Sequence, residues 1–246
     1  MIKKVMWAFA ALVVFIGFLI ISMPARFVLQ FADLPAGVQI GGVSGSVWRG
    51  EVGTLRADEI LLRDVQWRVR PLQLLGGRLQ LDVVIDEHVE NLVVGEGTLT
   101  ISSARMSVND MVLEARLTDL AAYAPQPSPF PLRGDVQLHI VQFELGQPAC
   151  SHTQGRVELL GGAMQVGQTW EDLGDLQATL GCEEGWVTGE LQPNTLGLTA
   201  SMRMNMHQAQ GEFQINESAQ APRSVRNLVA MLPEQARRVQ RFSVRF

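Results

Sequence analysis

The alternation of apolar and polar residues is the feature that most constrains the fold of this chain. Between about residue 38 and residue 217, apolar side chains recur at every second position, which is the period of a β-strand. Strands with one apolar and one polar face are typical of antiparallel sheets. We therefore expect a mainly β fold built on an antiparallel, twisted or curled β-sheet. The clearest alternating runs are 65–70, 79–86, 98–102, 113–117, 136–140, 201–207 and 213–215.

Turn-forming residues separate these runs and predict a meander of hairpins. The predicted turns are Gly76-Gly77, Gly95-Glu96-Gly97, Asn109-Asp110, Gly161-Gly162, Glu184-Gly185 and Pro193-Asn194.

The strand period is interrupted twice. Residues 118–132 hold Pro125, Pro127, Pro129 and Pro131, which a sheet interior does not tolerate. We expect a short helical turn there, followed by an extended connection between two halves, 38–118 and 133–217. The halves are loosely alike, so an internal duplication stays open. Residues 222–241 predict a short C-terminal helix interrupted at Pro233, and the closing RFSVRF predicts a last strand.

An uncharged apolar run, Val5 to Ala25, lies near the start of the chain. About 20 apolar residues span a bilayer as a helix, so we expect a transmembrane helix at 5–25. Lys3 and Lys4 precede the run and only Arg26 follows, which favours a cytoplasmic N-terminus, residues 1–4, and a bulk outside the cytoplasm. A cleaved signal peptide is the alternative, although its apolar core usually runs only about 7–15 residues. After the run, Phe27–Asp33 is expected to continue as a helix briefly, until Pro35 and Gly37.

Charge is distributed unevenly along the chain. The net charge is −5, yet both ends are basic, so the body between them is strongly acidic. Such a body argues against nucleic acid as a partner, because phosphates require Lys and Arg opposite them. In the basic C-terminal segment, Arg237, Arg238 and Arg241 are candidate partner-binding residues, and a solvated basic end is the alternative.

The chain has 2 cysteines, Cys150 and Cys182. Both lie in the part expected outside the cytoplasm, where disulfides persist. We expect them to form a disulfide; two unpaired buried thiols are the alternative.

The sequence lacks the residue patterns of known catalytic and metal sites. None of the 4 histidines has a partner at the spacing of a zinc site. Gly42 to Ser46 is similar to a serine elbow, but Ser46 stands where that motif requires glycine. We therefore expect no enzyme, no metal and no cofactor. The stripe of Met202, Met204 and Met206 fits either core packing or an adaptable binding surface.

One stretch carries a family resemblance. Residues 41–50, GGVSGSVWRG, follow the apolar run, and a Trp, a Pro-Leu and a Gly-Gly turn follow in order. This arrangement resembles protein N of the type II secretion system, also called general secretion pathway protein N. The residues that carry the resemblance are Gly42, Ser44, Gly45, Ser46, Trp48, Gly50, Trp67, Pro71 and Gly76.

The resemblance implies a single-pass protein of the bacterial inner membrane with a periplasmic β-rich domain at 26–246. It implies an accessory role in exporting folded proteins across the outer membrane, with other components of the secretion system as partners. The family supplies no catalytic residues to transfer.

Shorter pieces also resemble AsmA-like periplasmic proteins, which implies an alternative function in handling lipid within an apolar β-trough. The two functions differ in what the apolar sheet face does. A closed core hides its side chains, whereas a trough leaves a large apolar patch in contact with solvent. The exposure of Val83, Ile85, Leu138, Ile140 and Met204 distinguishes them.

Overall fold

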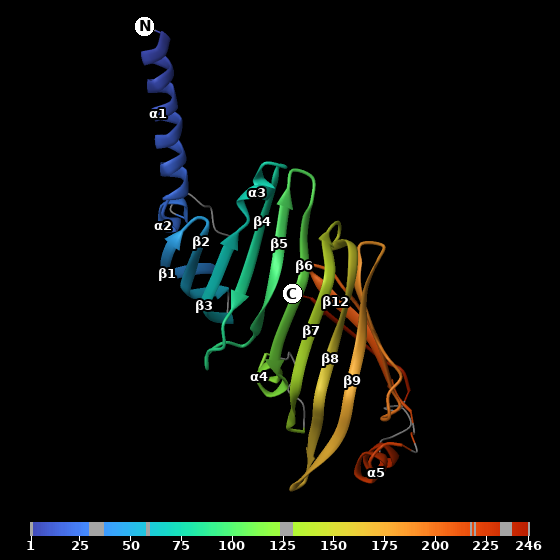
Figure 1. The fold of residues 1–246 in the computed structure, drawn as a ribbon. Helices are drawn as coiled ribbons and strands as arrows, with labels where there is room; N and C mark the ends of the chain where they lie inside the picture. Colours follow the sequence, from blue (N-terminus) through green and yellow to red (C-terminus); the bar gives the residue numbers. More distant parts are fainter. Residues whose placement is uncertain are drawn as a thin grey trace. The chain divides into compact units, whose positions relative to one another are not determined.

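The computed structural model describes residues 2–29, 37–57, 60–123, 130–216, 218, 220–231 and 238–245. The chain divides into two compact units, Met1–Asn91 and Leu92–Phe246. Each unit is built on antiparallel strands (Figure 1). The division falls at a different place from the connection expected at 118–132, of which residues 124–129 lie outside the described residues.

The first unit combines N-terminal helices with a meander of strands. Its strands pair antiparallel in the order β1, β2, β3, β4, so that each lies beside its neighbour in the sequence. The elements are α1 (Ile2–Ile21), α2 (Ala25–Leu29), β1 (Val38–Ser46), β2 (Arg49–Ala57), β3 (Ile60–Val69), α3 (Pro71–Leu74) and β4 (Arg78–Ile85).

Helix α1 occupies most of the apolar run near the start of the chain. Its described side chains from Met6 to Ile21 are exposed, apart from the half-buried Gly17. Among the residues that the structure describes, no helix combines the length and the apolar character that a membrane crossing requires. Helix α2 forms where a brief helix was expected, and its continuation at 30–36 lies outside the described residues.

The second unit is a longer meander, and its strands also pair antiparallel in sequence order. Figure 1 shows the long strands β7, β8 and β9 bending, with later strands passing behind them in the view. The elements are β5 (Val94–Ser102), β6 (Met106–Arg116), α4 (Leu117–Ala121), β7 (Leu132–Leu145), β8 (Cys150–Val166), β9 (Thr169–Glu183), β10 (Trp186–Leu191), β11 (Leu198–Met204), β12 (Gln208–Ile215), α5 (Arg223–Met231) and β13 (Gln240–Arg245).

These elements confirm the mainly β, antiparallel fold, but three of the predicted turns are wrong. The stretches at 95–97, 109–110 and 161–162 lie inside β5, β6 and β8 rather than between strands. The pairing register shifts beside Gly97 and across Gly161-Gly162, as in β-bulges. Gly95, Asp110 and Gly161 have positive φ angles, and glycine adopts such angles in bulges as readily as in turns. The residue pattern that predicts a turn at these three places belongs to β-bulges within the strands.

The strand register places the apolar residues of the second unit on one face of its sheet. Directly paired residues share a face, so the pairings join apolar residues into rows across the strands. One row runs Leu113, Leu138, Val157, Ala178, Leu191. The other face carries polar rows, among them Glu114, Gln137, Glu158, Gln177.

The side chains chosen to distinguish a closed core from a trough are not exposed. Ile140 is buried, and Val83, Ile85, Leu138 and Met204 are half-buried. An open trough would leave them in contact with solvent. This result does not support the lipid-handling alternative.

Helix α5 closes part of the apolar face of the second unit. Val225 and Val229, four residues apart on one side of the helix, are buried with Leu196 and Ala221. The partly buried side chains that pack against this cluster come from β9, β11 and β12: Leu173, Leu176, Leu198 and Ile215. The helix expected at 222–241 is thus present as Arg223–Met231, while residues 232–237 lie outside the described residues.

Adjacent positions on β7 test this assignment of faces. Ile140 is 7% exposed and Val141 is 50% exposed, and both are β-branched aliphatic residues. We expect Ile140→Asp to destabilise the protein by about 3–5 kcal/mol, because it buries an unpaired charge. The matched Val141→Asp should cost about 1 kcal/mol or less. Chemical denaturation measures both, and equal losses would show that the face assignment is wrong.

Candidate functional site

The residues that carry the family resemblance gather around the hairpin between β1 and β2. Ser46 pairs with Arg49, which leaves Val47 and Trp48 as the two residues of the turn. The Ser46 hydroxyl accepts a hydrogen bond from the Arg49 N–H at 3.3 Å. This hydrogen bond stabilises the turn, because the short side chain of serine reaches the backbone of a residue close to it in the sequence.

Trp67, on the neighbouring strand β3, contacts both sides of this hairpin turn. Its indole Nε1–H donates to the Val47 carbonyl at 3.3 Å. Trp67 also pairs directly with Gly50, and its ring lies where a Gly50 side chain would be. A Cβ at Gly50 would overlap both the Trp67 ring and the Ser44 carbonyl oxygen. The tryptophan and the glycine are therefore required together.

Two further glycines of the hairpin, Gly42 and Gly45, are required by the conformation of the backbone. Gly42 and Gly45 have φ angles of 68° and 86°, which residues with a side chain rarely adopt. A Cβ at Gly45 would also come within 2.5 Å of the Arg49 carbonyl oxygen. Most of the motif is thus explained by steric requirements of one tight hairpin rather than by chemistry.

Backbone hydrogen bonds tie this hairpin to the segment that follows α1. The Val47 N–H donates to the Met23 carbonyl at 3.0 Å, and Pro24 forms an isolated bridge with Ser46. Ala25, the first residue of α2, is buried. The end of α1 is therefore connected to the sheet through the motif.

The connection from β3 to β4 lies at this same end of the sheet. The Val69 N–H donates to the Trp48 carbonyl at 2.8 Å, and Pro71 then begins α3. The Arg70 guanidinium contacts Asp82, with Nε 2.9 Å from Oδ2. The hydrogen bond that Arg70 donates to Asp82, together with the negative charge of that carboxylate, raises the pKa of Arg70 above its ordinary value. Gly76 lies in the turn that leads into β4.

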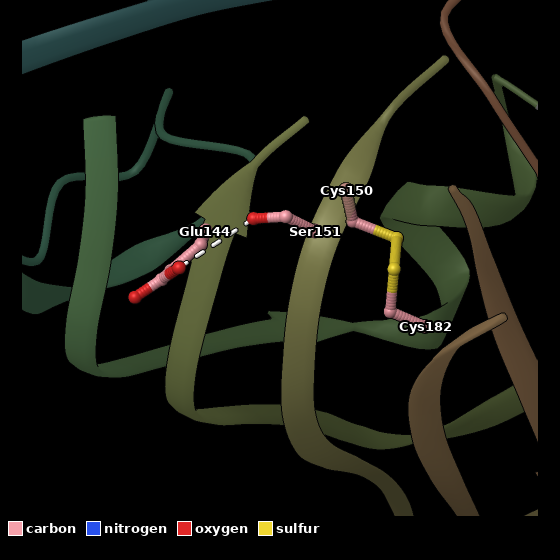
Figure 2. The surroundings of a disulfide bond; sticks show 4 residues. All are labelled: Glu144, Cys150, Ser151 and Cys182. Carbon is pink, nitrogen blue, oxygen red and sulfur yellow. Dashed lines mark hydrogen bonds between the residues drawn. A yellow bond between two sulfur atoms is a disulfide. The ribbon is translucent and has the colours of Figure 1, made fainter. Parts of the chain in front are cut away.

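The disulfide expected between Cys150 and Cys182 is present in the second unit. It joins the start of β8 to the end of β9, with the two Cα atoms 6.1 Å apart (Figure 2). Cys150 is 2% exposed, so reagents in solution have little access to its sulfur. The Cys150 N–H donates to the Gly185 carbonyl at 3.1 Å, which fixes the approach to β8 against the β9–β10 turn.

A polar contact lies on the other side of this strand. The Ser151 hydroxyl donates to the carboxylate of Glu144 on β7 at 3.5 Å. Figure 2 marks this hydrogen bond with a dashed line. Ser151 and Cys150 point in opposite directions, because successive residues of a strand face opposite sides of the sheet.

Of the candidate partner-binding arginines, the structure describes Arg238, which precedes β13, and Arg241 on that strand. Arg238 is exposed, and Arg237 lies outside the described residues. Arg241 forms an ion pair with Glu212 on β12, 3.3 Å apart, and both side chains are largely exposed. Exposed pairs of this kind contribute about 0–1 kcal/mol, so Arg241 can exchange Glu212 for another acidic group at little cost. Partner binding by these arginines stays a prediction.

Arg241 also lines a hollow of about 660 Å³ over β10 to β13. The lining carries charges of both signs, including Glu190, Glu212 and Arg203. The methionine stripe is divided here: Met202 lines the hollow, Met204 is half-buried, and Met206 is exposed beyond the end of β11.

Asn91 is a structural residue that the sequence did not indicate. Its buried side chain accepts from the Arg63 N–H at 2.6 Å and donates to the carbonyls of Arg63 and Asp86. It therefore connects β3 to the loop after β4. A single asparagine in a polar loop has no pattern in the sequence that could reveal this role.

Comparison with known proteins identifies the family. The family described as type II secretion system (T2SS), protein N matches residues 36–244, which include nearly all of the strands and the disulfide. The chain belongs to this family. The match confirms the resemblance seen at GGVSGSVWRG.

Two relatives carry the family's name, type II secretion system protein N. The protein from Vibrio cholerae serotype O1 (strain ATCC 39315 / El Tor Inaba N16961) is 22% identical over 220 residues, which cover 87% of this chain and 86% of the relative. The protein from Aeromonas hydrophila is 29% identical over 193 residues, covering 77% and 75%. No solved structure matches the chain.

Two glycines on neighbouring strands test the hairpin of this family member. Gly50→Ala should destabilise the protein by about 2–4 kcal/mol, because the added methyl group overlaps the Trp67 ring and a backbone oxygen. At Gly41 the nearest atom to an added Cβ is 3.9 Å away, so Gly41→Ala should change stability by less than about 1 kcal/mol. Thermal unfolding compares the two variants. Similar losses would show that the ring does not restrict Gly50.

The disulfide should contribute measurable stability to this family member. Cys150 and Cys182 are 32 positions apart, and a loop of this size stabilises by about 3–4 kcal/mol in the chain-entropy description. We expect Cys150→Ser and Cys182→Ser each to lower the midpoint of thermal unfolding. Alkylation of the unreduced protein should label neither cysteine, and rapid labelling of both would contradict the assignment.

Proposed function

We propose that this chain is a non-enzymatic accessory component of the type II secretion system that supports export of folded proteins from the periplasm. The match of residues 36–244 to the protein N family carries this proposal. The relatives from Vibrio cholerae and Aeromonas hydrophila, both named for the same system, support it. The proposal includes no catalytic step, since the sequence supplies no catalytic motif.

The proposal places α1 in the inner membrane, with the N-terminus in the cytoplasm and the β-rich units in the periplasm. The uncharged run from Val5 to Ala25 supports this placement. So does the exposure of the described apolar side chains of α1, which the other described residues do not cover. Lys3 and Lys4 set the orientation. The disulfide in the second unit suits an oxidising compartment.

The partners in this proposal are other components of the secretion system. The acidic body and the basic β13 region offer surfaces of opposite charge, which favour electrostatic docking to proteins. Such docking weakens with salt, because exposed charges are screened within about 8–10 Å at physiological ionic strength.

A deletion strain tests the function. We expect exported proteins to accumulate in the periplasm when the gene is absent, and the intact chain to restore their release. The lipid composition of both membranes is measured in the same cells. Normal secretion with altered outer-membrane lipids would reject the proposal and favour the lipid-handling alternative.

A further inference from the structure

The short helix α3 presents leucines to solvent. Leu72 is 79% exposed and Leu75 is 88% exposed, and Leu74 beside them is also exposed. Isolated apolar side chains on a surface are common, but adjacent leucines at the tip of one connection form a local apolar patch. Leu72 and Leu75 therefore contribute little to the packing of the described part of the first unit.

The leucines are held on an ordered turn. Pro71 begins α3, and the Gly77 N–H closes its end by donating to the Leu74 carbonyl at 3.0 Å. At the base, the Arg70 N–H donates to the Gln80 carbonyl at 2.9 Å. The connection between β3 and β4 therefore displays the leucines in a fixed arrangement.

This tip lies at the end of the sheet from which α1 departs. Met23, just after α1, accepts from the Val47 N–H, and Trp48 accepts from the Val69 N–H. Val69 ends β3, and α3 follows it directly. Figure 1 shows α1 and α3 on the same side of the first-unit strands.

Exposed arginines lie at the same end of the first-unit sheet as the patch. Arg49 pairs directly with Arg68 across β2 and β3, and like charges in this position repel each other unless an anion lies between them. Asp82 opposes Arg68 and pairs with Arg70, which leaves an excess of positive charge at this end. The exposed arginines here are Arg26, Arg49, Arg68, Arg70 and Arg78.

We propose that the α3 tip, Leu72 to Leu75, inserts into the interfacial layer of the membrane that holds α1, while the arginines at this end of the sheet bind anionic lipid headgroups. The inference rests on the proposed anchoring of α1. Apolar side chains beside cationic ones are the combination that binds the surface of an anionic bilayer. The tip would then give the first unit a second attachment and fix its orientation on the membrane.

Spin labels attached to single introduced cysteines on the full chain test the inference. The native cysteines are paired with each other, so the label attaches only at the introduced position. A label at Leu75→Cys is compared with one at Val89→Cys, which is 91% exposed and follows the opposite end of β4. A third label at Leu12→Cys reports on α1. The protein is placed in nanodiscs of phosphatidylethanolamine with phosphatidylglycerol, or of phosphatidylcholine alone. Accessibility to oxygen, which concentrates in lipid, is compared with accessibility to a water-soluble nickel chelate.

We expect the oxygen-to-nickel ratio at position 75 to be several-fold above that at position 89. The ratio at position 75 should fall in phosphatidylcholine alone, and in the anionic nanodiscs when Arg49 and Arg78 are replaced by Gln. A lipid environment at position 12 with water at position 75 would overturn this inference and leave the anchoring intact. Water at position 12 would overturn the anchoring itself. Protection of position 75 in native membranes but not in nanodiscs would assign the patch to a protein partner and also overturn the inference.

Discussion

Strand register is the constraint on which the rest of this structure depends. In a strand, a slip of one residue moves every side chain to the opposite face. Here the pairings bring Leu138 beside Leu113 and Val157, while Gln137 lies beside Glu114 and Glu158. A slip in β7 alone would place leucine among glutamates. The burial of α5 against β9, β11 and β12 depends on the same register.

The strands and their faces could be predicted because their cause is local. Period two in the sequence follows directly from the geometry of a strand, and runs such as 65–70 and 136–140 form strands as expected. The short terminal helix was predicted from an equally local pattern, and the expected closing strand is also present. The misread glycines show the limit of local reasoning. Positive φ angles occur both in turns and in bulges, and only the partner strand decides which one forms.

The candidate site could be predicted less completely. The motif around Trp48 and Trp67 was recognised from its residues, but its physical basis required the pairing of Gly50 with Trp67. The disulfide was predictable because only two cysteines were available. Asn91 and the leucine tip of α3 were not identified, since their roles depend on which loops the strands bring to one end of the sheet. Arg241 was expected to be available for a partner, and it is shared with Glu212.

The order of the strands has a consequence for how the chain acquires its structure. Within each unit, every strand after the first pairs with the one that precedes it along the chain. Contacts that are close in sequence need little loop closure and form early. Pairing can therefore advance from the N-terminal side while later residues are still emerging, because no early strand must wait for a distant one. A sheet built in this order grows progressively and exposes one unpaired edge at a time.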